Sequence, residues 1–115
     1  MDPGAIFKAI SSYCLAKPGA FEDHPWGDTV FKVAPKGKIF CFCGEKEPMV
    51  CVKSTLEKQA VLIQQPNIEV AAYVGRHGWV TVFIRDQETY DLAFELIDES
   101  YAMIAPPPAR RRSKA

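Results

Sequence analysis

The sequence has no long apolar run and no net charge, and it has only two histidines. No stretch approaches the roughly 18 to 20 consecutive apolar residues of a membrane-spanning helix. The N-terminus also lacks the basic, apolar, small-residue order of a signal peptide. We therefore expect a cytoplasmic protein with no membrane segment. A chain of 115 residues with 48% apolar content can form one domain with one core, but not two.

The four cysteines lack the C-x-x-C spacing that wraps a metal ion. Cys14 falls in a helical pattern, whereas Cys41, Cys43 and Cys51 fall in apolar strands. Because disulfides rarely persist in the cytoplasm, we expect four free thiols and no cofactor or metal. Zinc held by the three strand cysteines is the alternative, although thiols on a flat pleat converge poorly.

The zero net charge hides an uneven distribution. All 14 acidic residues but only 10 of the 14 basic ones lie before residue 110, so residues 1–109 carry a charge of −4. The segment Arg110-Arg111-Arg112-Ser113-Lys114 carries the remaining +4. A basic arm on an acidic body is typical of proteins that bind phosphates or acidic surfaces, and a solvated tail is the alternative.

The first half of the chain predicts a helix followed by a three-stranded meander. Asp2 is a suitable N-cap for a helix that the Lys17-Pro18-Gly19 run ends. β-branched and aromatic residues then predict strands at 29–34, 39–43 and 49–53.

In the second hairpin we expect Phe42 to pair with Val50 and Phe40 with Val52, because this register gathers four hydrophobes on the core face. The reverse face would then hold Cys41 opposite Cys51 and Cys43 opposite Met49, and could receive a partner.

The second half predicts a helix, a strand and a last helix. A capping box at Ser54-Thr55-Leu56-Glu57 begins a helix that ends at Gln65, with Leu56, Ala60, Val61 and Ile63 as its apolar residues. After a loop, residues 79–84 form a buried strand, and Asp86 caps a final helix. Its apolar positions are Tyr90, Phe94, Ile97, Tyr101 and Ile104, and its other side is acidic.

This order predicts a two-layer α+β fold with a mostly antiparallel sheet and helices on one face. Residues 1–105 would form the domain, and residues 106–115 a proline-rich, basic tail.

Two tryptophan motifs bracket the strands. They are His24-Pro25-Trp26-Gly27-Asp28 and Gly75-Arg76-His77-Gly78-Trp79. Each places an aromatic ring beside glycine and a titratable group, which favours a binding loop. The two tryptophans could stack on bases or pack at the edge of the core, and we expect Trp79 to be mostly buried. Neither histidine has a nucleophile in a motif that would use it, so we expect no enzymatic activity.

Together with Phe31-Lys32-Val33, Lys38-Ile39-Phe40 and Ser100-Tyr101, these motifs resemble the MmcQ/YjbR family of small bacterial proteins over residues from about 5 to 112. The motif residues are His24, Pro25, Trp26, Gly27, Gly78 and Trp79. The resemblance implies an α+β fold similar to frataxin and CyaY, a double-wing arrangement and a predicted DNA-binding activity. The side chains expected to contact phosphates are Lys32, Lys36, Lys38, Lys46, Arg76, His77, Arg110, Arg111 and Arg112.

Three function classes follow from these observations. The first is weak, largely sequence-independent DNA binding by a monomer, because no recognition helix is present. The second is a protein-interaction or adaptor domain that uses the apolar outer face of the sheet. The third is a small-ligand or metal-binding protein, although the first helix holds no acid after Asp2 that could bind iron as frataxin does.

Overall fold

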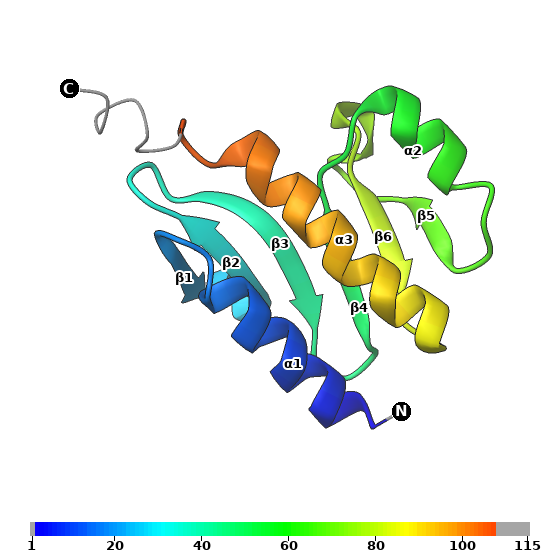
Figure 1. Ribbon diagram of the computed structural model, residues 1–115, viewed down its shortest axis with the longest axis horizontal. Helices are drawn as coiled ribbons and strands as arrows, with labels where there is room; N and C mark the ends of the chain where they lie inside the picture. The colour runs from blue at the N-terminus through cyan, green and yellow to red at the C-terminus, as the bar shows by residue number, and fades with distance from the viewer. Residues whose placement is uncertain (1, 108–115) are drawn as a thin grey trace.

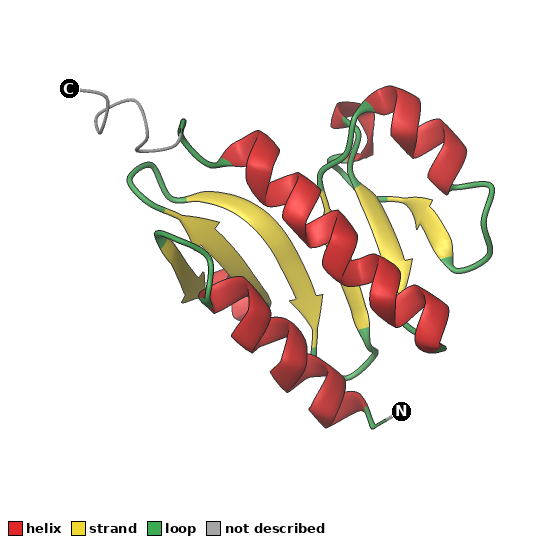
Figure 2. Ribbon diagram, viewed as in Figure 1, coloured by secondary structure: helices red, strands yellow, loops and turns green. Residues whose placement is uncertain are grey.

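The computed structural model describes residues 2–107, in which two long helices lie across one face of a six-stranded antiparallel sheet (Figures 1 and 2). The helices are α1 (Pro3–Leu15), α2 (Leu56–Leu62) and α3 (Gln87–Ile104), with short 3-10 turns η1 (Pro25–Gly27) and η2 (Gly75–His77). The strands are β1 (Ala20–Asp23), β2 (Thr29–Val33), β3 (Lys38–Gly44), β4 (Met49–Val52), β5 (Ile68–Val70) and β6 (Val80–Phe83). Their order across the sheet is β1-β2-β3-β4-β6-β5.

The predicted α+β class with helices on one face is confirmed, but the predicted element order is incomplete. It lacks β1 and β5, the two edge strands. In β5 only Ile68 is buried, and in β1 Phe21 is 41% exposed beside two acidic residues, so neither strand carries a clear apolar pattern. No helix in residues 2–107 is both long enough and apolar enough to cross a bilayer.

The predicted register of the β3–β4 hairpin is wrong by one residue. Cys41 pairs with Val52 and Cys43 with Val50, so Phe42 lies opposite Cys51. The cause is a bulge in β3: Phe31 pairs with Cys41 and Lys32 with Ile39, which leaves Phe40 without a partner in β2.

The bulge changes which side chains reach the core. Phe40 and Cys41 both join the core under the helices, together with Cys43, Val50 and Val52. Ile39, Phe42, Met49 and Cys51 instead form a second cluster with Trp79 on the outer face of the sheet. Of the expected cysteine surface, Cys41 is lost to the core, whereas Cys51 and Met49 lie on the outer face as predicted.

The second helix is shorter than expected and faces differently. Thr55, not Ser54, is the N-cap, since its hydroxyl accepts a hydrogen bond from the backbone N–H of Lys58. The helix ends at Leu62, three residues before the expected end. The four apolar residues expected to face the core are exposed, namely Leu56, Ala60, Val61 and Ile63. Leu62 and the amide side chain of Gln59 are buried in their place.

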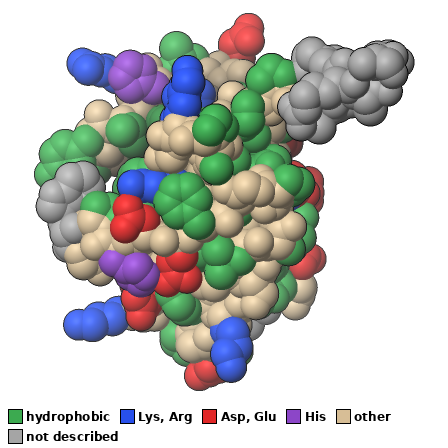
Figure 3. All heavy atoms as spheres, turned by 90° about the vertical axis from the view of Figure 1, so that its left-hand side faces the viewer, with side chains coloured by type: hydrophobic (Ala, Val, Ile, Leu, Met, Phe, Trp, Pro, Cys, Tyr) green, Lys and Arg blue, Asp and Glu red, His purple; other side chains and the backbone are tan. Residues whose placement is uncertain are grey.

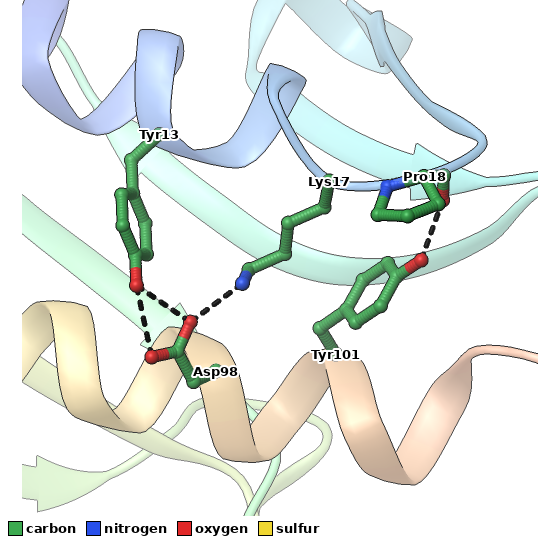
Figure 4. A network of polar contacts seen from close by, with 5 residues as sticks. All are labelled: Tyr13, Lys17, Pro18, Asp98 and Tyr101. Atoms are coloured by element: carbon green, nitrogen blue, oxygen red, sulfur yellow. Dashed lines mark hydrogen bonds and ion pairs between the residues drawn. The ribbon is translucent and has the colours of Figure 1, made fainter. Parts of the chain in front are cut away.

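A polar network joins α1 to α3 (Figure 4). The hydroxyl of Tyr13 donates to both carboxylate oxygens of Asp98 at 2.8 and 2.9 Å, and the ammonium of Lys17 donates to the same carboxylate at 2.5 Å. Beside it, the Tyr101 hydroxyl donates to the carbonyl of Pro18 at 2.5 Å. These contacts fix the angle between the two helices above the sheet.

Ser100 of α3 joins two strands where they separate. Its hydroxyl donates to the carbonyl of Phe40 at 2.6 Å and accepts from the backbone N–H of Lys53 at 2.9 Å. The side chain is fully buried. Because unpaired backbone groups are costly inside a protein, this hydroxyl takes the place of a ladder hydrogen bond between β3 and β4.

Candidate functional site

Several of the predicted basic residues lie toward one end of the sheet, which is the upper end in Figure 1, with the β2–β3 turn to the left and η2 to the right. Since neighbouring strands are antiparallel, the start of β3, the end of β4 and the start of β6 lie together. This end carries Lys36 and Lys38 at the β2–β3 turn, Lys53 after β4, and Arg76 and His77 in η2. We call these five residues the basic end. Lys38 lies three residues before Cys41, whose partner Val52 pairs with the first residue of β6, so the β2–β3 turn extends about 10 Å along β3 beyond the start of β6.

The C-terminal segment leaves the body at the basic end. A hollow at the β2–β3 turn is lined by Lys36 and Lys38 on one side and by Pro106 and Pro107 on the other. Arg110, Arg111 and Arg112 lie outside the described residues. At no more than about 3.6 Å per residue, however, the chain keeps each of them within about 18 Å of Pro107.

The other two predicted lysines do not join this cluster. Lys46 lies in the β3–β4 turn, at the opposite end of the seven-residue strand β3 and about 23 Å away. Its neighbour Glu45 accepts a hydrogen bond from Thr29, and Glu47 pairs with Arg85 at 3.3 Å. Lys32 forms an ion pair with Asp23 at 2.6 Å. Figure 3 shows the β1 side of the molecule, where most acidic side chains lie below the upper end.

The second tryptophan motif is a rigid loop. Gly78 has φ +95°, and a Cβ there would lie 2.1 Å from the carbonyl oxygen of Ser54. The buried amide of Gln59 donates to the carbonyls of Gly75 at 2.7 Å and Trp79 at 2.9 Å. The ammonium of Lys53 donates to the carbonyl of His77 at 3.0 Å. Close packing of this backbone therefore fixes where Arg76 and His77 lie.

The tryptophan of the second motif is mostly buried. Trp79 is 9% exposed, which confirms its predicted burial, and packs edge-on against Phe42 with ring centroids 5.8 Å apart. Trp26 lies in η1 between Pro25 and Gly27. His24 contacts the carboxylate of Glu22 through Nε2 at 2.6 Å.

The four cysteines are free thiols, as predicted, and all four are buried. Burial raises the pKa of Cys43 to about 12 and that of Cys51 to about 11, and it also raises the pKa of Cys41. The thiol, not the metal-binding thiolate, is therefore the stable form at neutral pH. Within residues 2–107, no cluster of three or more His, Cys, Asp or Glu side chains is placed to hold a metal ion.

A second hollow lies on the outer face of the sheet, the face on which the sequence predicted a surface that could receive a partner, but the hollow itself and its Phe42 wall were not predicted. It has a volume of about 600 Å³ and is lined by side chains from β3 and β4 and from the segment 72–74. We call it the outer-face groove. Only the register of β3 reveals it, because that register turns Ile39 and Phe42 outward.

These features define a small α+β domain with a basic end and an apolar outer groove. A family model described as YjbR matches residues 15–103. The chain belongs to the YjbR family. Among curated proteins, none matches it.

A solved structure has the same fold. The crystal structure of a protein from Pseudomonas syringae superimposes with a TM-score of 0.68 over 84% of this chain and 97% of that chain. The two sequences are 20% identical, so the likeness supports the fold and says nothing of the activity.

Proposed function

We propose that this protein binds the phosphate backbone of DNA weakly and largely without regard to sequence, through the basic end and the arginines of the tail. In this proposal it acts in the cytoplasm as a monomer and catalyses no reaction. The carrying observation is that Lys36, Lys38, Lys53 and Arg76 lie at one end of the sheet, where the chain leaves toward Arg110, Arg111 and Arg112.

Charge supports this location over the rest of the surface. The body carries a net charge of −4 before residue 110, so a polyanion is repelled by most of it. Several acids of α3 lie on its outer side, where Asp98 and Glu99 pair with Lys17 and Lys58. Phosphates would therefore approach the end where cations outnumber acids.

The same geometry argues against base-specific recognition. The helices α1 and α3 pack lengthwise on the sheet, and α3 presents carboxylates to solvent, so neither offers a basic recognition helix for the major groove. Lysines on a turn contact phosphates and carry no sequence information. We expect duplexes of different sequence to bind with similar affinity.

Fluorescence anisotropy of a labelled duplex tests the proposal. The affinity of the full chain should fall steeply with salt, because each phosphate contact contributes a slope of about −0.9 to log K against log salt. Changing Arg110 and Arg111 together to glutamine should weaken the slope by up to about 1.8.

The matched control changes Lys8 and Lys46 to glutamine, which removes the same charge away from the basic end. This pair should leave the slope nearly unchanged. Salt-independent binding, or equal losses from both pairs, would contradict the phosphate contacts proposed here.

The adaptor function expected from the outer sheet face has less support. The outer-face groove is a local hollow of about 600 Å³. Its dimensions are those of a small-molecule site, in the range of roughly 300 to 1,000 Å³.

A further inference from the structure

The outer-face groove has apolar walls that the fold holds in place. Phe42, Met49 and Cys51 line it from neighbouring strands, and Phe42 is braced by the buried ring of Trp79. Ile39 extends the same surface along β3. Because these side chains belong to the paired strands, the apolar wall exists before any ligand arrives.

Tyr73 stands at the side of this groove. Its side chain is 99% exposed, although it lines the hollow, and its backbone has φ +65°. A tyrosine in the left-handed region costs on the order of 1 kcal/mol, and full exposure means that little packing within the chain repays that strain. An aromatic ring that makes so little contact within the chain is available to a ligand that enters the groove.

The charge at the groove is negative. Asp28 lines the groove, and no Lys or Arg is among the residues of the described chain that do so. The carboxylate of Glu45 lies close by, because Thr29, another lining residue, donates to it at 2.9 Å. A cation is therefore favoured in the groove and a phosphate is disfavoured.

We propose that the outer-face groove binds a small aromatic molecule that carries one cationic group, such as a protonated amine. The ring packs on Phe42, Met49 and Tyr73, and the aromatic faces of Phe42 and Tyr73 also attract a cation. The ammonium pairs with the carboxylate of Asp28. This site is separate from the basic end and does not depend on DNA binding.

Isothermal titration of the full chain with three matched probes tests the assignment. The probes are 1-naphthylmethylamine, 1-naphthylmethanol and 1-naphthylacetate, which share a ring and differ in charge. The amine should bind most tightly and the acetate most weakly, with at least a tenfold difference between them. Equal affinities, or tighter binding of the acetate, would overturn the proposal.

Two variants locate the site. Tyr73→Ala should weaken amine binding at least tenfold, whereas Val61→Ala, at an exposed apolar position on α2, should leave it unchanged. Asp28→Asn should remove the preference for the amine over the alcohol, with Asp91→Asn as its control. Amine binding that survives both groove variants would show that the groove is not the site. Lys36→Glu with Lys38→Glu should leave amine affinity intact, so a failure here is distinct from a failure of DNA binding.

Discussion

The two turns that flank β3 resemble each other in sequence but differ in their surroundings. The β2–β3 turn carries Lys36 and Lys38 and lies beside the end of α3. The β3–β4 turn carries Lys46 between two glutamates whose carboxylates are engaged. Consecutive turns of an antiparallel meander lie at opposite ends of their shared strand, so these two cannot contact one short stretch of phosphates. The neighbour of the first turn is the end of α3, which is distant from it in sequence.

The largest expected loss of stability comes from a substitution that displaces the backbone next to η2. Gly78→Ala should lower the free energy of unfolding by at least about 3 kcal/mol, because a Cβ would overlap the carbonyl of Ser54 and the residue has a positive φ. Gly27→Ala is the control, since its φ is +84° but nothing lies within 4 Å of its added Cβ. It should cost only about 1 kcal/mol. Urea unfolding measures both variants, and equal losses of unfolding free energy for Gly78→Ala and Gly27→Ala would contradict a role for the close approach to Ser54.

Removing the Ser100 hydroxyl tests how the basic end is joined to the helices. Ser100→Ala should lower the free energy of unfolding by about 2 to 3 kcal/mol, because it leaves the Phe40 carbonyl and the Lys53 N–H unpaired. Ser12→Ala, on the exposed side of α1, should change it by less than about 0.5 kcal/mol. The hydrogen exchange of the Lys53 amide provides a local measurement. An amide that stays protected in Ser100→Ala would contradict the bridge.

A smaller effect on stability is expected at Asp98, which lies in neither turn. Burial acts to raise the pKa of Asp98, but the hydrogen bonds from Lys17 and Tyr13 outweigh it and hold that pKa below the usual value of 3.8. A lowered pKa gives stability that is complete above the unfolded value and is lost as the pH falls through the folded one. Since the carboxylate is half-exposed, the contribution at pH 7 is below about 1 kcal/mol.

Asp98→Asn should therefore flatten the acid side of the stability curve below about pH 4. Urea midpoints between pH 2 and 7 measure this, with Asp91→Asn as the control. A variant that keeps the full acid dependence would exclude the pair as its source.

Much of the fold could be predicted from local signals. The caps at Asp2 and Asp86 and the spacing of the final helix predicted α1 and α3 correctly, because these signals lie within a few residues of each other. The register of β3 could not be predicted, because alternation assumes an unbroken ladder and the bulge at Phe40 breaks it. The Gln59 and Ser100 contacts join residues 16 to 60 positions apart, and only the folded chain reveals them.

The candidate site was predicted only in part, because it too depends on which segments the folded chain brings together. Sequence identified the basic residues but not which turns lie together, so Lys46 was grouped with Lys36 and Lys38. The outer-face groove was missed because the predicted register turned Phe42 toward the core. Recognising that a β-bulge at Phe40-Cys41 reverses the facing of the following residues would have revealed the outer-face groove.

The most direct test of the account compares charge reversal at the basic end with charge reversal away from it. Lys36→Glu with Lys38→Glu and Lys8→Glu with Lys46→Glu change the net charge equally, and only the first pair alters the basic end. Anisotropy with a labelled duplex at low salt should show at least a tenfold loss of affinity for the first pair and less than about a threefold loss for the second, since phosphate contacts act over about a Debye length. Equal losses, or an unchanged affinity for the first pair, would contradict a phosphate site at the basic end.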